Sequence, residues 1–457
     1  MHAAEQLFFE GTRQIAARNY ADAEDCFRRT VAMAPHLAEA HANLGWLLDE
    51  ADAPDEADAC YRRALALNAS NPQIHLNYGA LLSRMKRFRE AEAVYLNALQ
   101  LDPQSAAAWS NLGVLCAQMA RYAEATTCCL NSLLIDPGYA KAHINLAYLY
   151  LRQGRFEEGW AHLERRTWKY TPPQDVSCPR WRGESLRGKS ILIGHEGGLG
   201  DMIQFARYAQ VLRERGARRV TLVCPPALQT LLASMPGADE VLSLDAALPA
   251  GNWDCWASSM SLPFHCKTRL HSIPAALPYL RANRHAAARW SALMPPARLR
   301  VGLVWQGNPK FENDSERSIA SLDLLQPLGG IAGVAFISLQ KGCGEAQAKN
   351  PPKGLDIACL PDEIEDFADT AAIVANLDLV ISVDTAVAHL AGAMGKPCWI
   401  LLPHHMPDWR WLAERDDSPW YPGAVRLFRQ PTRGDWATVV TQVRAALNAF
   451  SARAGCR

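Results

Sequence analysis

One pattern of 34 residues recurs five times in the first third of this 457-residue chain. The position that holds glycine in the first four copies is filled by Gly11, Gly45, Gly79, Gly113 and then Ala147. Alanine, proline and aromatic positions repeat with the same period, and each copy has two segments with apolar residues at helical spacing. A fixed period of this length predicts a solenoid of stacked helix pairs, in which the small residues let two helices approach closely.

The period and its small residues resemble the tetratricopeptide repeat over residues 4–170. In the last copy Gly159, Leu163 and Arg166 take places that usually hold alanine, an aromatic residue and alanine. Such a departure is expected of a terminal repeat that meets another domain. The resemblance implies a long concave surface, so we expect a protein or peptide partner held by the repeats.

An asparagine also repeats in register. It occurs at Asn43, Asn77, Asn111 and Asn145. Side-chain amides in a row along one face can bind an extended peptide backbone without reading its side chains. The alternative is that these asparagines cap or bridge neighbouring helices, and the sequence leaves both interpretations open.

Charge and composition exclude several classes of partner. Lysine plus arginine and aspartate plus glutamate both total 47, so no basic excess favours nucleic acid or an anionic membrane. The first residues have no secretory-signal pattern, and no stretch reaches the roughly 18 apolar residues of a membrane span. The thirteen cysteines form no Cys-x-x-Cys pair. We therefore expect reduced thiols, no metal site and a cytoplasmic protein.

The 34-residue period stops near residue 171, and residues 171–189 form a predicted linker rich in turn residues. Short apolar runs then alternate with helical segments, which predicts parallel sheets. A proline-rich stretch divides these runs into two Rossmann-like halves, residues 190–297 and 298–457, with a cleft between them. The expected fold class is an α-solenoid followed by a two-halved α/β region.

The first candidate site is a glycine-rich turn after the first predicted strand. Gly197, Gly198 and Gly200 allow a ligand to approach the backbone, and Asp201 begins the next helix. The spacing is not the dinucleotide fingerprint, so a nicotinamide cofactor is not favoured. Asp201 has two interpretations, a functional carboxylate or a helix cap. His195, in the same turn, is a further candidate for the cleft.

Two later strand ends also carry polar residues. One is followed by a loop with Asn308, Lys310 and Arg317, where cations suit a phosphate and solvated loop charges are the alternative. The other ends at Asp384 and Thr385, where a small-residue helix begins at once. Free N–H groups at that helix start would face a negatively charged ligand group.

Two histidine and aromatic features remain. His389 lies one helical turn after Thr385 and either faces the same ligand or is simply packed. Trp409 belongs to an aromatic-rich segment, residues 404–422, that either binds a sugar or base in the cleft or covers a core. His404 and His405 have no carboxylate or cysteine at a spacing that completes a metal site.

Together these segments resemble the heptosyltransferase-like glycosyltransferases of family 9, which have a GT-B fold, over about residues 188–450. The turn GGLGD at 197–201 is similar to that family's Gly-x-Gly-Asp turn, and residues 384–397 are similar to its donor-site motif. The resemblance implies inverting transfer of a sugar from a nucleotide donor, without a metal or another cofactor. Ala386 stands where the family usually has glycine, and the tryptophan-rich segment after Pro403 differs from the family's short turn.

The same resemblance assigns roles to individual residues. Asp201 would be the general base that removes the acceptor proton. The residues implied for the donor's diphosphate or ribose are Lys310, Arg317, Asp384, Thr385 and His389. Cations or N–H groups at a leaving nucleoside diphosphate are required if no metal supplies the positive charge.

Two functions other than catalysis stay open. The α/β region could be a scaffold that binds a nucleotide sugar without turning it over, or the whole chain could be an adaptor with no small ligand. A panel of nucleotide sugars separates the three, because only an enzyme hydrolyses or transfers a sugar. A pure adaptor shows no thermal shift with any nucleoside diphosphate.

Overall fold

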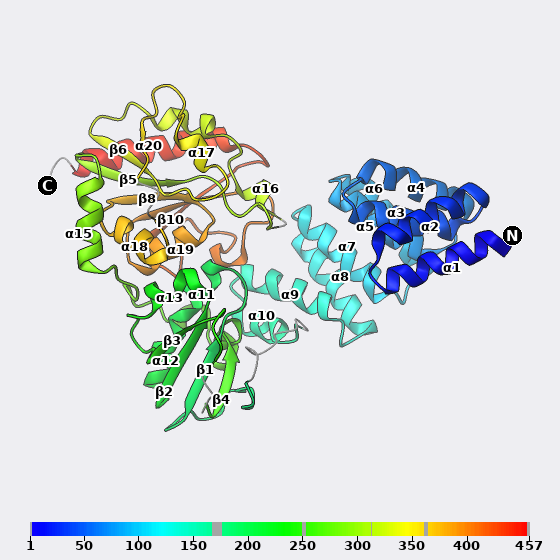
Figure 1. Cartoon of the computed structure of the whole chain (residues 1–457), viewed down its shortest axis with the longest axis horizontal. Coiled ribbons are helices and arrows are strands. Elements are labelled where there is room, and N and C mark those ends of the chain that lie inside the picture. Colours follow the sequence, from blue (N-terminus) through cyan, green and yellow to red (C-terminus); the bar gives the residue numbers. More distant parts are fainter. Residues whose placement is uncertain (1, 167–175, 249–252, 312, 361–363, 455–457) are drawn as a thin grey trace. The chain divides into compact units, whose positions relative to one another are not determined.

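The computed structural model describes residues 2–166, 176–248, 253–311, 313–360 and 364–454. The chain divides into two compact units, Met1–Leu146 and Ala147–Arg457, and each is described by itself (Figure 1). Residues 171–175 of the predicted linker lie outside the described residues.

The first unit consists of paired helices joined by short turns, as the repeat pattern predicts. The helices of the five repeats are α1 (His2–Ala16), α2 (Tyr20–Met33), α3 (Ala38–Glu50), α4 (Pro54–Leu67), α5 (Pro72–Arg84), α6 (Phe88–Leu101), α7 (Ala106–Gln118), α8 (Tyr122–Ile135), α9 (Ala140–Arg152) and α10 (Phe156–Leu163). A Cβ atom at Gly79 would lie 2.6 Å from the Tyr95 ring, so glycine is needed for the two helices to pack this closely. The helical solenoid is confirmed.

Two features of the repeat were not visible in the sequence pattern. The turn inside each of the first four repeats contains a residue with positive φ, between 60° and 63°, at Arg18, Asp52, Lys86 and Ala120. A ring nitrogen also lies 2.9 to 3.1 Å from the carbonyl oxygen six residues earlier, in His41, His75, Trp109 and His143. Both features follow the 34-residue period. The same local geometry therefore recurs in the turn within a repeat and at the junction between repeats.

The fifth repeat belongs in part to the second unit. Phe156 and Trp160 of α10 are each 2% exposed and join the core of the α/β region. The Trp160 indole donates a hydrogen bond to the Thr268 carbonyl at 3.0 Å, and its ring meets Trp409 edge to face at 5.3 Å. The predicted solenoid runs to residue 170, whereas the compact units separate at Leu146. Large aromatic side chains on α10 explain this difference, because they are buried against the α/β region.

The first sheet is parallel and has the strand order β3-β2-β1-β4. Its strands are β1 (Ser190–Gly194), β2 (Arg219–Cys224), β3 (Glu240–Ser243) and β4 (Cys255–Ser258). The helices of this half are α11 (Leu199–Ala206), α12 (Tyr208–Glu214), α13 (Pro226–Leu232), α14 (Leu262–His265) and α15 (Arg284–Leu293). Every residue of β1 is buried, as expected for a central strand covered on both faces.

The second sheet is also parallel and has the order β10-β9-β8-β5-β6-β7. Its strands are β5 (Leu299–Val304), β6 (Val334–Ser338), β7 (Ile357–Ala358), β8 (Leu379–Val383), β9 (Cys398–Leu402) and β10 (Val425–Arg429). Its helices are α16 (Asp314–Arg317), α17 (Glu345–Ala348), α18 (Phe367–Ala375), α19 (Ala386–Ala393) and α20 (Trp436–Ala454). Numbered within this half, the order is that of a Rossmann sheet, 3-2-1-4-5-6. The prediction of parallel α/β sheets is confirmed.

Candidate functional site

The strand orders define where each sheet changes direction. This switch point lies between β1 and β4 in the first sheet and between β5 and β8 in the second. Ligands of open α/β sheets bind beyond the carboxyl ends of the strands at such a point. Asp384 and Thr385 follow β8 directly, Gly307 and Asn308 lie shortly after β5, and His195 follows β1.

Helix α11 of the first half packs on α19 of the second (Figure 1). A Cβ atom at Gly200 would lie 2.8 Å from Cδ2 of His389 and 3.5 Å from the Cα atom of Ala386. Gly200 therefore allows the first turns of two helices, one from each half, to meet. The structure thus brings the glycine-rich turn and the segment after β8 together.

Asp201 is engaged by two groups at this meeting point. Its Oδ2 accepts a hydrogen bond from the Gly198 backbone N–H at 2.6 Å, so the carboxylate closes the first turn of α11 as a helix cap does. Its Oδ1 forms an ion pair with the guanidinium of Arg410. The cap anticipated as an alternative is present, and the ion pair is an addition that the sequence did not reveal.

Arg410 is the main site residue that sequence reasoning missed. It lies in the short 3₁₀ turn Trp409–Trp411, and its side chain is only 7% exposed. Its Nε donates to Gln204 Oε1 at 2.6 Å, and Nη1 donates to the two Asp408 oxygens at 2.9 and 2.8 Å. The available signal was an arginine placed between Trp409 and Trp411, because a cation among large apolar side chains needs polar or charged partners.

Asp384 and His389 form the second part of the cluster. Asp384 Oδ1 lies 3.9 Å from His389 Nε2, and His389 Nδ1 is 2.8 Å from the Tyr421 hydroxyl. Burial raises the pKa of Asp384 to about 6, and the Asp408 carboxylate adds to this shift. Burial, helped by the charge of Arg410, holds the pKa of His389 well below its usual value, so the imidazole is neutral at pH 7.

The predicted phosphate-binding residues separate in the structure. Arg317 joins the cluster, because its charge opposes the rise in the pKa of Asp384. Its own Nε pairs with Asp314 Oδ1 at 2.9 Å. Lys310 and Asn308 lie exposed in the loop after β5, where the Asn308 side chain accepts a hydrogen bond from the Lys310 backbone at 3.1 Å. Arg317 is thus near Asp384 and Lys310 is at the loop surface.

The structure also locates three further residues that the sequence analysis named, Thr385, Trp409 and His195. The Thr385 hydroxyl lies 2.9 Å from the Ser382 hydroxyl, just before the first turn of α19. Trp409 is 4% exposed and covers a core, with the guanidinium of Arg410 4.4 Å from its ring centroid. His195 is half-buried, and burial lowers its pKa while the nearby Asp201 charge opposes that shift.

A second buried arginine occupies the switch point of the first sheet. Arg166, just after α10, donates to both Glu196 oxygens at 2.7 and 2.6 Å and to the Ser261 hydroxyl at 2.9 Å. Glu196 follows β1, and Ser258, which ends β4, also contacts that carboxylate. The fifth repeat therefore places one of its own side chains beside the carboxyl ends of β1 and β4.

The repeated asparagines are half-buried in the solenoid. Asn77 accepts a hydrogen bond from Gln73 at 2.8 Å, and Asn145 donates to Ser110 of the preceding repeat at 3.2 Å. Asn111 hydrogen-bonds Tyr95. Asn145 and Ser110 show the bridging role that the sequence left open, which does not remove a role in peptide binding.

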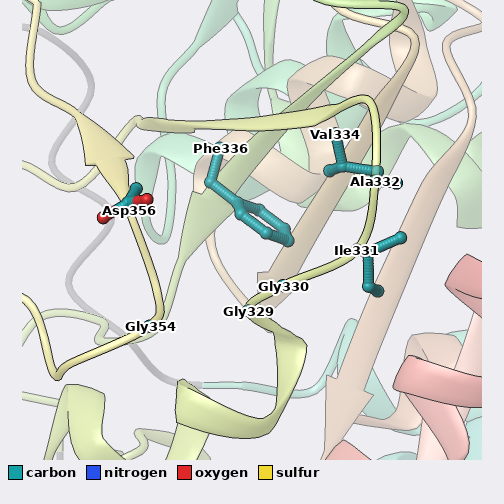
Figure 2. Close-up of a pocket in the computed structure, with 8 residues that line it drawn as sticks. All are labelled: Gly329, Gly330, Ile331, Ala332, Val334, Phe336, Gly354 and Asp356. Carbon is teal, nitrogen blue, oxygen red and sulfur yellow. The ribbon is translucent and has the colours of Figure 1, made fainter.

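A hollow of about 280 Å³ lies away from these residues, at the β6–β7 edge of the second sheet (Figure 2). Gly329, Gly330 and Gly354 contribute backbone, Phe336 and Ile331 contribute apolar surface, and Asp356 carries a negative charge. Among the described residues no lysine or arginine lines it, so it does not suit a phosphate. The charged cluster at the switch point is the better candidate.

Within residues 2–166, 176–248, 253–311, 313–360 and 364–454, no group of three or more His, Cys, Asp and Glu is placed to hold a metal ion. No helix in those ranges combines the length and apolar character needed to cross a membrane.

Comparison with known families identifies the repeats. Residues 10–72 and 79–126 match one tetratricopeptide repeat model and residues 128–161 match another. Protein FlbA of Caulobacter vibrioides is 29% identical over 325 residues, which cover 65% of this chain and 53% of that protein. The chain thus spans about half the length of this curated relative.

Several solved structures are similar to part of the chain. Pseudomonas aeruginosa pilF is 26% identical, with 36% of this chain and 75% of that chain covered and a TM-score of 0.34. YrrB, a TPR protein with an unusual peptide-binding site, is 18% identical, with 35% and 82% covered and a TM-score of 0.30. It is the two family models that identify the repeat region as a tetratricopeptide solenoid, the kind of module that binds proteins.

Proposed function

We propose that the chain is a metal-independent, inverting glycosyltransferase of GT-B type that acts in the cytoplasm. The observation that carries the proposal is the meeting of α11 and α19 at the switch points of two Rossmann-ordered sheets. Asp201, His389 and Arg410 gather there, from both halves. Two such halves, in contact through α11 and α19, suit a reaction that needs a donor on one side and an acceptor on the other.

The second half suits the donor. The free N–H groups at the start of α19 and the charges of Arg317 and Arg410 favour a diphosphate after β8. A nucleoside diphosphate leaves with extra negative charge, and fixed cations and N–H groups can stabilise it without a metal. Neutral His389 can donate or accept one hydrogen bond toward the donor, since its Nδ1 faces Tyr421.

The first half suits the acceptor. Asp201 would accept the proton of the attacking hydroxyl, which attacks the sugar's anomeric carbon as the bond to the diphosphate breaks. The tetratricopeptide repeats support a protein or peptide as the acceptor, because such solenoids present long binding surfaces. The nucleotide-sugar donor is then a substrate, and no cofactor is required.

The test uses the full chain, a panel of nucleotide sugars and two variants. We expect the wild type to hydrolyse or transfer the sugar of one donor, and Asp201→Asn to lose about 100-fold or more in rate while still binding the nucleoside diphosphate. Asp245→Asn, an exposed aspartate of the first half, is the matched control. Full turnover by Asp201→Asn would reject this residue as the base, and no turnover with any donor would reject the enzyme.

A nucleotide-sugar-binding scaffold is the second candidate. The observation that favours it is that Asp201 already has two partners, a helix N–H and Arg410, as in a purely structural cap. This candidate predicts that a donor binds and raises the melting temperature, with no product after long incubation with peptide extracts.

A further inference from the structure

Arg410 connects the two halves through carboxylates of different kinds. Asp408 comes from its own loop, accepts two bonds from Nη1 and also accepts the Arg410 backbone N–H at 2.9 Å. Asp201 comes from α11 of the other half and contacts only Nη2. Asp408 therefore anchors the arginine in its loop, whereas Asp201 is the partner that can be exchanged without dismantling that anchor.

Around Arg410, carboxylates outnumber the arginines that are free to pair with them. Arg317 is committed to Asp314, and Arg410 is left near three carboxylates, Asp201, Asp408 and Asp384. Arg207, a further buried cation nearby, donates its bonds to the carbonyl oxygens of Gln204, Pro274 and Trp420 and to the Tyr279 hydroxyl. Arg410 is thus the cation shared between Asp201, the proposed base, and Asp384, which follows β8.

A guanidinium has five N–H donors, and phosphate accepts two parallel bonds from it well. Arg410 donates from Nε to Gln204, from Nη1 to both oxygens of the Asp408 carboxylate, and from Nη2 to Asp201. A second Nη2 hydrogen is left over, and the bond to Asp201 is the one that a phosphate at the start of α19 would compete for.

We propose that Arg410 is a positioning residue that exchanges partners: it holds Asp201 when no donor is bound and turns its Nη2 group to the donor's diphosphate when one binds. This inference rests on the proposed function. Release from Arg410 leaves Asp201 Oδ1 free to accept the acceptor hydroxyl proton, while Gly198 keeps Oδ2 in place. Asp201 therefore becomes available as a base only after the donor has bound. This order of events predicts that the donor binds before the acceptor.

The exchange makes Asp201 and the diphosphate competitors for one cation. Because linkage is reciprocal, removing the Asp201 charge must strengthen diphosphate binding by the coupling between the two. We expect Asp201→Asn to bind the diphosphate more tightly by about 5- to 150-fold, the usual range of such coupling. The probes are UDP, GDP, CDP and ADP, titrated separately by calorimetry against the full chain.

The control is Asp408→Asn, which removes the same charge from the other carboxylate beside Arg410. We expect this variant to bind the diphosphate no more tightly than wild type, because Asp408 anchors the arginine. In Asp201→Asn/Arg410→Gln the gain should disappear. Asp201→Ser, which keeps a side-chain oxygen in the first turn of α11 without the charge, repeats the measurement if Asp201→Asn folds poorly by circular dichroism.

The outcomes separate this inference from the function it rests on. Tighter binding in Asp201→Asn but not in Asp408→Asn supports partner exchange. Equal affinity in wild type and Asp201→Asn, or an equal gain in both variants, overturns it and leaves the glycosyltransferase proposal standing. If no nucleoside diphosphate binds to wild type or to any variant, both proposals fail.

Discussion

Two buried arginines close to β1 each pair with a carboxylate, but the two pairs connect different parts of the molecule. The Arg166 side chain is 6% exposed and pairs with Glu196, and the Arg410 side chain is 7% exposed and pairs with Asp201. Arg166 joins the fifth repeat to the first sheet, and Arg410 joins the second half to the first. Both partner carboxylates follow β1, Glu196 in the turn after it and Asp201 in the first turn of α11.

The two clusters differ in how completely the charges are matched. Arg166 makes a two-fold contact to Glu196 and is flanked by Glu164, which in turn pairs with Arg180. In the Arg410 cluster, burial and the neighbouring Asp408 carboxylate raise the pKa of Asp384, and the charges of Arg317 and Arg410 do not offset this rise. The Arg166 cluster is matched and fixes structure. The Arg410 cluster is unmatched, because three carboxylates surround one arginine and compete for it.

The largest expected effect is on the matched cluster. Arg166→Met leaves Glu196 buried without its cation, and we expect a loss of about 3–5 kcal/mol in the free energy of unfolding of the α/β unit. Denaturant unfolding followed by near-ultraviolet circular dichroism measures it, since most tryptophans lie in this unit. Arg165→Met, at the exposed neighbouring residue, is the control. Equal losses in the two variants would contradict a structural role for the Arg166 pair.

The second prediction concerns the unmatched charge. The pKa of Asp384 is raised from 3.8 to about 6, so the folded state binds a proton more tightly than the unfolded state does. This contribution makes stability fall as the pH rises from about 4 to about 6, by at most about 3 kcal/mol. Asp384→Asn should therefore be more stable than wild type at pH 7 and equal to it at pH 4.

Melting temperatures of both proteins across pH 4 to 8 check this sign. A stability gain in Asp384→Asn of the same size at pH 4 and pH 7 would mean that the ionised carboxylate is not the cause. A loss at pH 7 would show that Arg410 and Arg317 compensate the charge after all, which would remove the contrast between the clusters.

The third prediction tests the contact that holds the unmatched cluster together. Gly200→Ala places a methyl group 2.8 Å from His389 Cδ2, so α11 and α19 must separate, and we expect a cost of about 1–3 kcal/mol. At Gly198 the nearest atom to an added Cβ is Asp201 Oδ2 at 3.5 Å, which makes Gly198→Ala the matched control. Thermal unfolding of both variants measures this cost. Similar melting temperatures would show that α11 and α19 can move apart to accommodate the methyl group without loss of stability.

The smallest effect is expected at the exposed edge of the matched cluster. Arg180 pairs with Glu164 but its side chain is 40% exposed, so Arg180→Met should cost less than about 1 kcal/mol. The same denaturant experiment measures it beside Arg166→Met. A cost as large as that of Arg166→Met would mean that the network acts as one unit and that burial does not rank its members.

The sequence predicted what depends on local period and on strand ends. The glycine positions placed the helix pairs, because Gly79 must meet Tyr95 sixteen residues later in the same repeat. Asp384 and Thr385 could be placed at a strand end because a buried strand directly precedes a small-residue helix. Both inferences use residues that are close along the chain.

What the sequence did not predict are pairings between distant segments. Arg410 and Asp201 are 209 residues apart, and Arg166 and Glu196 belong to different predicted domains. Neither pairing has a period or spacing that marks it. The extension of the α/β core into the fifth repeat was missed for the same reason, because Trp160 finds Thr268 only in the folded chain.

The stacking of Trp411 on His389 gives the molecule an optical reporter of its own. The two rings lie 5.2 Å apart at 26°, and Trp411 is fully buried. Indole emission depends on the charge and polarity beside the ring, and this ring lies next to a neutral imidazole and the Arg410 loop. Any event that moves that loop or charges that histidine will change the fluorescence of the unlabelled chain, and Trp411→Phe will identify which part of the signal is local.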